Sequence, residues 1–271
     1  MSKNFTLNGV GFGSRHPLAL IAGPCVIESR QQTLDIAARL VRMAKRLDVP
    51  LVFKASYDKA NRTSIQSYRG PGLAKGLEIL AEIREKYSIP VLTDVHTIEE
   101  IHIASRFIDI IQLPAFLIRQ TDFVIAAGES GCAINIKKAQ FAAPWDMANV
   151  VKKIESTGNK KMLLTERGAS FGYNTLVADM RSLIILRELG YPVIFDATHS
   201  VQSPGGKGDS SGGDGRFAPY LAKAATAVGV DGLFIETHPE PEKALSDGPN
   251  MVPLAQMPAL WKKLVAIDAA K

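Results

Sequence analysis

The sequence alternates eight short apolar runs with longer amphipathic stretches. The apolar runs are LALIA (18–22), LVFK (51–54), VLTD (91–94), DIIQL (109–113), AINIK (133–137), MLLTE (162–166), VIFD (193–196) and GLFIE (232–236). The intervening stretches, for example 31–47 and 73–87, carry apolar residues at helical spacing. A strand followed by a helix, repeated along the chain, is typical of a parallel α/β sheet with crossover helices.

Eight such units favour a closed (β/α)8 TIM barrel, because closure leaves no edge strand exposed. The length of 271 residues is close to the roughly 250 typical of this barrel, so we expect one domain over residues 1–271. The segment GVGFG near the start is expected to form a short β-hairpin that closes the barrel bottom. The alternative fold is a doubly wound sheet, whose ligand crevice forms at one switch point.

Nearly every apolar run ends in, or is followed by, a residue capable of chemistry. These residues are Lys54, Asp94, Gln112, Lys137, Arg167, Asp196 and Glu236. In a barrel they converge on one mouth, where the three cations would form a pocket for phosphate and carboxylate groups. Any one of them is explained equally well by the need of a strand to end in a loop. Together they favour a binding site.

Composition restricts the class of protein. No segment approaches the ~18 apolar residues of a membrane span, and the first residues lack the apolar core of a secretory signal. The two cysteines, Cys25 and Cys132, are too few for a disulfide framework, so we expect a cytoplasmic protein. The net charge is +5, but its basic residues form no tract. Small anionic ligands are therefore favoured over nucleic acid or a membrane.

Two glycine-rich segments do not match nucleotide-binding motifs. In SPGGKGDSSGGDGR (203–216), Lys207 is followed by Gly208 where a phosphate loop requires Ser or Thr. GVGFG lacks the spacing of a dinucleotide fingerprint. We therefore expect no nucleotide cofactor. The 203–216 segment is either a linker or a lid, and its position between the seventh strand and its helix favours the lid.

The segment KASYDKANRTS (54–64) is a plausible sugar-phosphate cradle, although a solvated loop has a similar composition. KANR, two hydroxyl residues and then SYRGPGL resemble the signature of 3-deoxy-D-manno-octulosonate 8-phosphate synthases. Related heptulosonate synthases usually have a KPRT-like loop there. The likeness continues in order through TDVH (93–96), IIQLPAFLIRQTD (110–122), NIKKAQF (135–141), ERGASFGYN (166–174), FDATHSVQ (195–202) and IETHPEPEKALSDGP (235–249). Thr63 departs from the expected Ser but keeps the hydroxyl.

The resemblance implies two substrates, phosphoenolpyruvate and D-arabinose 5-phosphate, and an early step of lipopolysaccharide (KDO) biosynthesis. It implies that phosphoenolpyruvate is held by Lys54, Lys59, Gln112, Lys137 and Arg167, the last two on its phosphate. It implies that arabinose 5-phosphate is held by Asn61, Arg62, Thr63 and Ser64, with Arg119 reaching the same phosphate in a neighbouring subunit. A homotetramer with shared sites is the expected assembly.

The implied reaction is an aldol-type condensation without a Schiff base. Carbon 3 of phosphoenolpyruvate attacks the aldehyde, water adds at carbon 2, and phosphate leaves by C–O cleavage. Lys54 and Lys137 would act by charge. The residues expected to take part in catalysis are Lys54, Asp94, Lys137, His199 and Asp247.

A metal site is suggested by Cys25, His199, Glu236 and Asp247, a mixed ligand set suited to zinc, iron or manganese. From the residues alone the signal is weak, because a lone Cys is more often a small buried hydrophobe. The resembled family divides into metal-dependent members with Cys in the first loop and metal-independent members with Asn there. AGPCVIES and SPGG here resemble the metal-dependent branch. One divalent metal ion, which either holds water or orients the aldehyde, is therefore expected.

The remaining candidates are open or structural. Cys132 begins the fifth strand and is expected in the core. His96 either lines the mouth or orders Asp94, whereas His16, His102 and His238 show no pattern and are taken as structural. Three other functions are weighed: a non-catalytic sugar-phosphate sensor, a heptulosonate-type synthase using erythrose 4-phosphate, and a sialic acid synthase using an unphosphorylated sugar. The KANR segment disfavours both other synthases, and the full ligand set disfavours the sensor.

Overall fold

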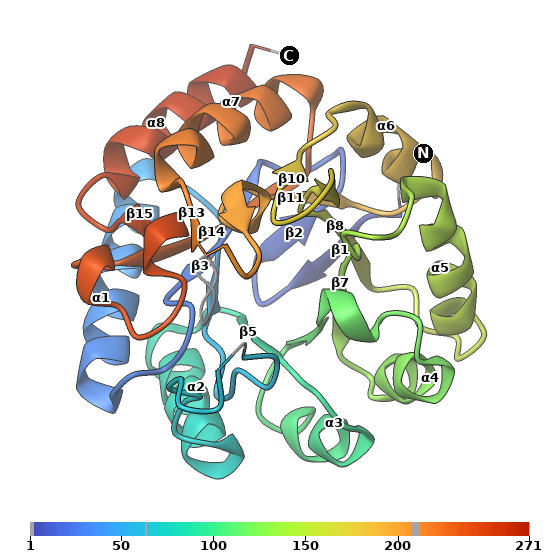
Figure 1. Cartoon of the computed structure of the whole chain (residues 1–271), viewed down its shortest axis with the longest axis horizontal. Helices are drawn as coiled ribbons and strands as arrows, with labels where there is room; N and C mark the ends of the chain where they lie inside the picture. The colour runs from blue at the N-terminus through green and yellow to red at the C-terminus, as the bar shows by residue number, and fades with distance from the viewer. Residues whose placement is uncertain (1–2, 63, 207–211, 271) are drawn as a thin grey trace.

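The computed structural model describes residues 3–62, 64–206 and 212–270, and eight parallel strands form a closed barrel at its centre (Figure 1). In barrel order the strands are β3 (Ala19–Gly23), β4 (Leu51–Lys54), β5 (Val91–Asp94), β6 (Ile110–Leu113), β7 (Ala133–Lys137), β8 (Met162–Glu166), β11 (Val193–Asp196) and β14 (Gly232–His238). Strand β14 pairs with both β11 and β3 and closes the ring. The predicted barrel is confirmed, and the doubly wound sheet is excluded.

The α-helices of the described chain form a ring around the strands (Figure 1). They are α1 (Arg30–Leu47), α2 (Leu73–Tyr87), α3 (Ile98–Ala104), α4 (Thr121–Glu129), α5 (Met147–Glu155), α6 (Arg181–Glu188), α7 (Ala218–Val228) and α8 (Met257–Asp268). Short 3-10 helices span Ala115–Leu117, Pro144–Asp146, His199–Val201, Gly215–Phe217, Pro241–Lys243 and Gly248–Asn250. Among the described helices, none combines the length and apolar character that crossing a membrane requires.

The apolar core has two parts, because side chains alternate between the two faces of each strand. The larger part lies between the strands and the helices and includes Cys132, as expected. The smaller part fills the barrel interior. It consists of Val10, Phe12, Ala19, Ile21, Val52, Leu92, Ile110, Ala133, Leu163, Ile194 and Phe234.

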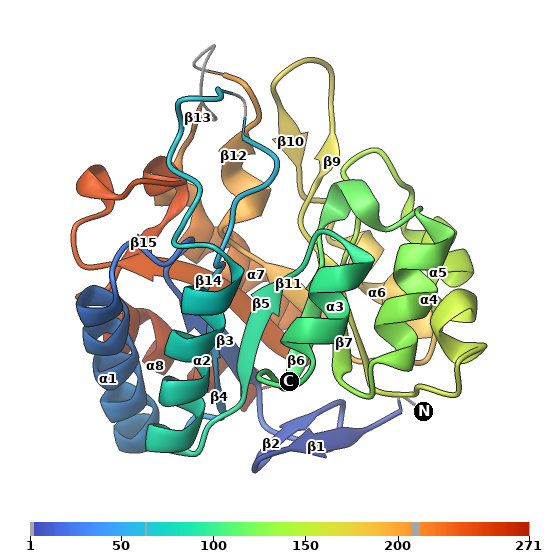
Figure 2. The same ribbon diagram turned by 90° about the horizontal axis from the view of Figure 1, so that it is seen from below.

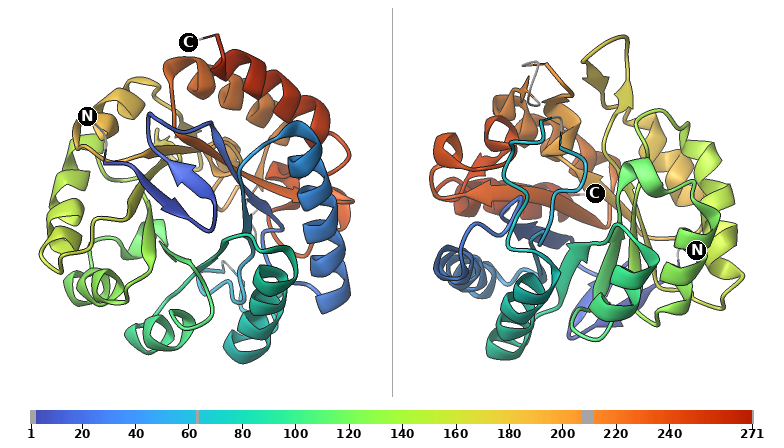
Figure 3. Two further views of the ribbon diagram at one scale, coloured as in Figure 1. Left: turned by 180° about the vertical axis from the view of Figure 1, so that it is seen from behind. Right: turned by 60° about the horizontal axis from the view of Figure 1, so that its bottom comes forward.

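The hairpin expected at the barrel bottom is present. It consists of β1 (Phe5–Leu7) and β2 (Val10–Phe12), joined through Asn8 and Gly9, both with positive φ. An Asn-Gly pair favours this turn because both central residues must adopt left-handed conformations. The hairpin lies across the end of the barrel opposite the long loops (Figures 2 and 3). Phe12 is fully buried there, so the hairpin acts as a plug.

The residue two positions after an interior apolar residue faces the same side of the strand, one layer closer to the mouth. In β4, β5 and β14, Lys54, Asp94 and Glu236 follow the interior residues Val52, Leu92 and Phe234 in this way. All three polar side chains are buried. The two-residue period of the strands therefore places a charged layer directly above the apolar one.

Short strands build the loops at the mouth. They are β9 (Ala169–Ser170), β10 (Leu176–Val177), β12 (Gln202–Ser203), β13 (Gly212–Gly213) and β15 (Val252–Pro253). The 203–216 segment begins and ends near the β12 and β13 ladder; residues 207–211 lie outside the described residues, so its role as a lid stays a prediction. Strand β15 pairs with Thr237 and His238 and returns the long loop after β14 to the barrel.

Replacing Phe12 by Ala is expected to lower the free energy of unfolding by about 3–5 kcal/mol, because it empties the plug beneath the charged layer. Thr6→Ala, on an exposed position of the same hairpin, is the matched control and should change it by less than about 0.5 kcal/mol. Urea denaturation of the three proteins measures both effects. Equal stability of the Phe12 variant and the native protein would contradict the role of the hairpin as a plug.

Candidate active site

A cavity of about 590 Å³ opens at the mouth of the barrel. Its described lining comes from the ends of seven of the eight barrel strands and from the loops that follow them. The polar and charged residues among them are Lys59, Asn61, Arg62, Ser67, Asp94, His96, Gln112, Lys137, Gln140, Arg167, Asp196, His199, Gln202, Glu236, Ser246 and Asp247. Six of the seven residues singled out at strand ends line this cavity. The seventh, Lys54, is buried, and its ammonium lies beside the carboxylate of Glu236.

Two buried ion pairs form the floor of the cavity. Lys54 Nζ lies 2.5 Å from Glu236 Oε1 and also donates to the carbonyl of Cys25 at 2.8 Å. Lys137 Nζ lies 2.5 Å from Asp196 Oδ2 and 3.1 Å from the centre of the Phe234 ring. Each lysine thus has a carboxylate partner, which makes its burial tolerable.

Burial lowers the pKa of Lys137 to about 8, although Asp196 opposes this change. The pKa of Asp196 itself lies well below its usual value because His199 and Lys137 outweigh the effect of its burial. Lys137 is therefore still mainly an ammonium at neutral pH. An anion bound beside it would favour that form further.

A chain of polar contacts crosses the cavity between two strands and the last loop. The guanidinium of Arg167 donates to Gln202 Oε1 at 2.9 Å, and Gln202 Nε2 donates to Asp247 Oδ1 at 3.1 Å. Burial lowers the pKa of Arg167. Gln202 was not singled out in the sequence, because its role depends on how β12 folds back over the mouth.

The segment after β4 forms one wall of the cavity. Arg62 is anchored by donating to the carbonyls of Tyr68 and Leu245, and Asn61 lines the cavity beside it. Burial lowers the pKa of Lys59, but the carboxylates of Asp94, Glu236 and Asp247 around it outweigh this and raise the pKa above its usual value. This wall is therefore positively charged.

Three candidate metal ligands meet beside the cavity. Ligand atoms of Cys25, Glu236 and Asp247 all lie within 4.8 Å of one another. Cys25 Sγ is 3.1 Å from Asp247 Oδ2, and burial raises the pKa of this thiol well above its usual value. Glu236 Oε2 is buried without a hydrogen-bond partner among the described residues. Sulfur and carboxylate ligands with an unsatisfied buried oxygen are a donor set that fits a divalent cation.

His199, the fourth predicted ligand, lies next to this group but is not part of it. Its Nε2 is 3.7 Å from Glu236 Oε2, and its Nδ1 is 2.7 Å from Asp196 Oδ2. Because Nδ1 of His199 contacts the carboxylate of Asp196, Nε2 faces Glu236. Metal-binding histidines commonly have this arrangement.

His96 both lines the cavity and contacts Asp94, so the two roles considered for it coexist. Its Nε2 lies 3.3 Å from Asp94 and its Nδ1 3.2 Å from Glu100, which in turn accepts a hydrogen bond from Tyr57. Burial lowers the pKa of His96, but its hydrogen bonds to the two carboxylates outweigh this and raise it to about 9. Glu100 and Tyr57 carry no sequence signal that marks them as partners.

Two of the predicted sugar-phosphate residues, Ser64 and Arg119, do not line the cavity. Thr63 is outside the described residues. Ser64 is half-buried, does not line the cavity, and accepts a hydrogen bond from the Gln66 amide. Arg119 is exposed, and its carbonyl accepts a hydrogen bond from Lys153 Nζ.

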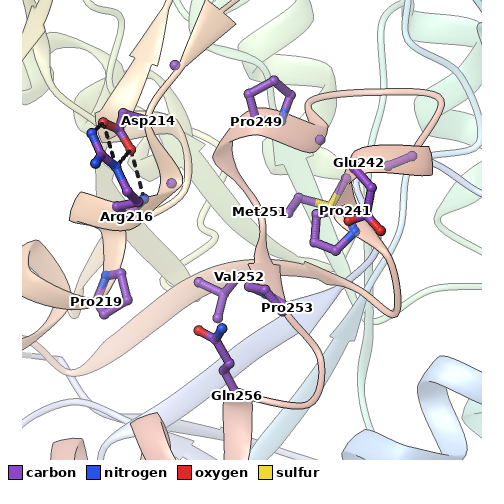
Figure 4. A pocket seen from close by; sticks show the side chains of 14 residues that line it. Asp214, Arg216, Pro219, Pro241, Glu242, Pro249, Met251, Val252, Pro253 and Gln256 are labelled. Carbon is purple, nitrogen blue, oxygen red and sulfur yellow. Dashed lines mark hydrogen bonds and ion pairs between the residues drawn. The ribbon is translucent and has the colours of Figure 1, made fainter.

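A second cavity, of about 680 Å³, lies on the outer side of the last loop (Figure 4). The two cavities share Ala244, Gly248 and Pro249 as a wall. The outer cavity is lined largely by proline, Met251 and Val252, and the side chains of Asp214 and Arg216 bind each other there. We therefore take the mouth cavity, with its convergent cations, as the candidate active site.

Replacing His96 by Gln is expected to lower the free energy of unfolding by on the order of 2 kcal/mol near pH 6. Because the folded pKa of about 9 exceeds the usual 6.5, this stabilisation is complete below the unfolded pKa and is lost as the pH rises through the folded one. Denaturant unfolding at about pH 6 and about pH 9.5 measures the difference. If the native protein and the variant differed in free energy of unfolding by the same amount at both pH values, the charged state of His96 would be contradicted.

Comparison with known proteins agrees with this geometry. The family model described as the DAHP synthetase I family matches residues 3–269. Relatives named 2-dehydro-3-deoxyphosphooctonate aldolase come from Geobacter metallireducens, 58% identical, and Geotalea daltonii, 60% identical, each over 269 residues and 99% of both chains. A third, from Granulibacter bethesdensis, is 61% identical over 263 residues, which are 97% of this chain and 93% of the relative. The chain therefore belongs to the DAHP synthetase I family.

Proposed function

We propose that this protein condenses phosphoenolpyruvate with D-arabinose 5-phosphate and water to give 3-deoxy-D-manno-octulosonate 8-phosphate and phosphate. The product serves lipopolysaccharide biosynthesis. The names of relatives that match over nearly the whole chain support this activity. The observation that carries it is one cavity in which Asn61 and Arg62 lie with Lys137 and Arg167. A site with one cation on its outer segment, Arg62, and two more at the strand ends, Lys137 and Arg167, is suited to two phosphorylated substrates.

Phosphoenolpyruvate occupies the deeper part of the cavity. Lys137 ends β7, and Arg167 directly follows the neighbouring strand β8. The two residues are 4% and 7% exposed, and they hold its phosphate. Lys59 and Gln112 hold its carboxylate side, and Lys54 supplies positive charge from below. Their burial strengthens each contact, because charge interactions gain strength away from water.

Arabinose 5-phosphate binds at the wall of the cavity that the segment after β4 forms. Asn61 and Arg62 hold it, with Thr63 and Ser64 supplying hydroxyl donors from the same segment. Arg119, which is exposed, reaches the phosphate bound by a neighbouring subunit in a homotetramer. Two hydrogen bonds to backbone carbonyls fix Arg62 before the substrate arrives, which reduces the entropy lost on binding.

The carbon–carbon bond forms without a Schiff base. Lys54 and Lys137 are paired with carboxylates, and a protonated amine is not a nucleophile. Their charges instead stabilise the anionic groups of phosphoenolpyruvate while carbon 3 attacks the aldehyde and water adds at carbon 2. The water that adds at carbon 2 releases one proton, and the aldehyde oxygen takes one up as the carbon–carbon bond forms. Asp94, held by Ser56 and His96 and lining the cavity, passes this proton between them.

Cys25, His199, Glu236 and Asp247 would hold one divalent metal ion. The support is the closeness of three of these ligands, the unpartnered Glu236 oxygen and the carboxylate on the far nitrogen of His199. When bound, such an ion supplies Lewis acidity or a template for the aldehyde or water. Lys54 donates a hydrogen bond to Glu236, so it connects these ligands to the proposed binding site of phosphoenolpyruvate.

The first test measures phosphate release from phosphoenolpyruvate with arabinose 5-phosphate, and with erythrose 4-phosphate as the control. Turnover is expected with the pentose phosphate and at least about tenfold slower with the tetrose phosphate, because the Asn61 and Arg62 wall differs from a heptulosonate-type loop. Preference for the tetrose would assign the heptulosonate reaction. No turnover with either sugar would leave only sugar-phosphate binding.

The second test replaces Cys25. Cys25→Ser is expected to lose bound metal and at least about a hundredfold in turnover, because the hydroxyl is a poor ligand for a borderline cation. Cys25→Asn should also lose metal but recover part of the activity, as expected from metal-independent relatives. Metal content and turnover are measured together, with Cys132→Ala, on the buried thiol near the barrel bottom, as the control. A fully active Cys25→Ser protein without metal would exclude the metal site.

A further inference from the structure

A buried ion pair lies next in the chain to Lys137 and Arg167, the two cations that are proposed to bind the phosphate of phosphoenolpyruvate. Lys138 and Glu166 are each 1% exposed, and Lys138 Nζ is 3.6 Å from Glu166 Oε1. Lys138 follows Lys137 in the chain, and Glu166 precedes Arg167. Because successive side chains alternate across a strand, the cavity-facing cations have neighbours that point outward toward the helices. The reaction described above does not use this pair.

The contacts of Lys138 join the ends of β7 and β8. Its ammonium donates to the carbonyls of Ala139, Ala142 and Gly168, at 3.2, 3.2 and 3.4 Å. Three acceptors match the three hydrogens of a charged lysine, which has no acceptor of its own. The backbone amide of Lys138 also donates to the carbonyl of Thr165 at 2.8 Å. The chain just after Lys137 is thereby tied to the chain on both sides of Arg167.

Glu166 fixes the other side of Arg167. Its Oε1 accepts from the backbone amide of Gly168 at 2.6 Å, and its Oε2 accepts from the hydroxyl of Ser182 at 2.7 Å. Gly168 has a φ of +91°, a conformation that side chains rarely adopt. The carboxylate therefore holds a tight turn around Arg167 and anchors it to the first turn of α6.

We propose that Lys138, Glu166 and Ser182 form a positioning unit that sets the spacing between Lys137 and Arg167, so that both bind one phosphate group of the substrate. This inference rests on the proposed function for the identity of that substrate. None of the three residues lines the cavity. They act through the backbone of the two residues that do.

Two buried charges are a costly way to join two strands, because an apolar pair of equal volume often gives equal or greater stability. What the ion pair adds is direction. The ammonium donates to three carbonyls, and the carboxylate accepts from an amide and a hydroxyl. Because hydrogen bonds require a limited range of distances and angles, the strand ends keep one relative position. A phosphate that must contact two cations at once is sensitive to this position, because small misplacements of binding groups reduce catalysis strongly.

The test uses the double variant Lys138→Met with Glu166→Gln, which removes both charges together and leaves no unpaired buried ion. The KM for phosphoenolpyruvate and the inhibition constant of inorganic phosphate are expected to rise at least about tenfold, while the KM for arabinose 5-phosphate changes less than about twofold. Ser182→Ala keeps both charges and should raise the same two constants by about two- to fivefold. Calorimetric titration with phosphoenolpyruvate gives its affinity independently of turnover.

The matched control is Arg187→Met with Asp231→Asn, which removes an ion pair near the opposite end of the barrel. It is expected to lower the melting temperature without changing either KM. Unchanged phosphoenolpyruvate and phosphate constants in the Lys138 double variant would overturn the inference. So would an equal rise in both KM values, since that outcome assigns the pair to stability alone. Native protein that binds phosphoenolpyruvate without turning it over would instead contradict the proposed function, and the calorimetric comparison would still decide the inference.

Discussion

Mutual neutralisation of buried charges at the barrel mouth is the interaction on which the candidate site depends. Lys54 with Glu236, and Lys137 with Asp196, place two cations and two carboxylates in one buried layer. Each charge would be too costly to bury alone. The layer is possible because the strands present charged residues two positions beyond apolar ones, above a plug that keeps water out from below.

The fold could be predicted almost completely from the apolar runs, because their period and length report directly on buried strands. Most predicted strands agree with the observed ones to within a residue. Strand β14 is the exception: it continues to His238 because β15 pairs with its end. That pairing depends on the path of a distant loop, which has no local signal in the sequence.

Site residues on strands could be predicted from the sequence, whereas site residues in loops were harder to predict. Lys137 and Asp196 follow from strand position, whereas Gln202 joins Arg167 to Asp247 only because β12 folds over the mouth. The closeness of Cys25 and Asp247, 222 positions apart, was indicated only weakly by the residue types and mainly by the family resemblance. Residues that far apart in the sequence come into contact only when the barrel closes and β15 holds the last loop against it, so their contact cannot be inferred from their spacing.

The plug formed by β1 and β2 also has a consequence for molecular traffic. With Phe12 filling the lower end of the barrel, both substrates and both products pass through the same opening. The proposed phosphate-binding residues Lys137 and Arg167 share this opening with the wall that carries Asn61 and Arg62. A sugar phosphate bound on that wall would block this opening, so phosphoenolpyruvate binds before it, and the inorganic phosphate leaves after the joined product.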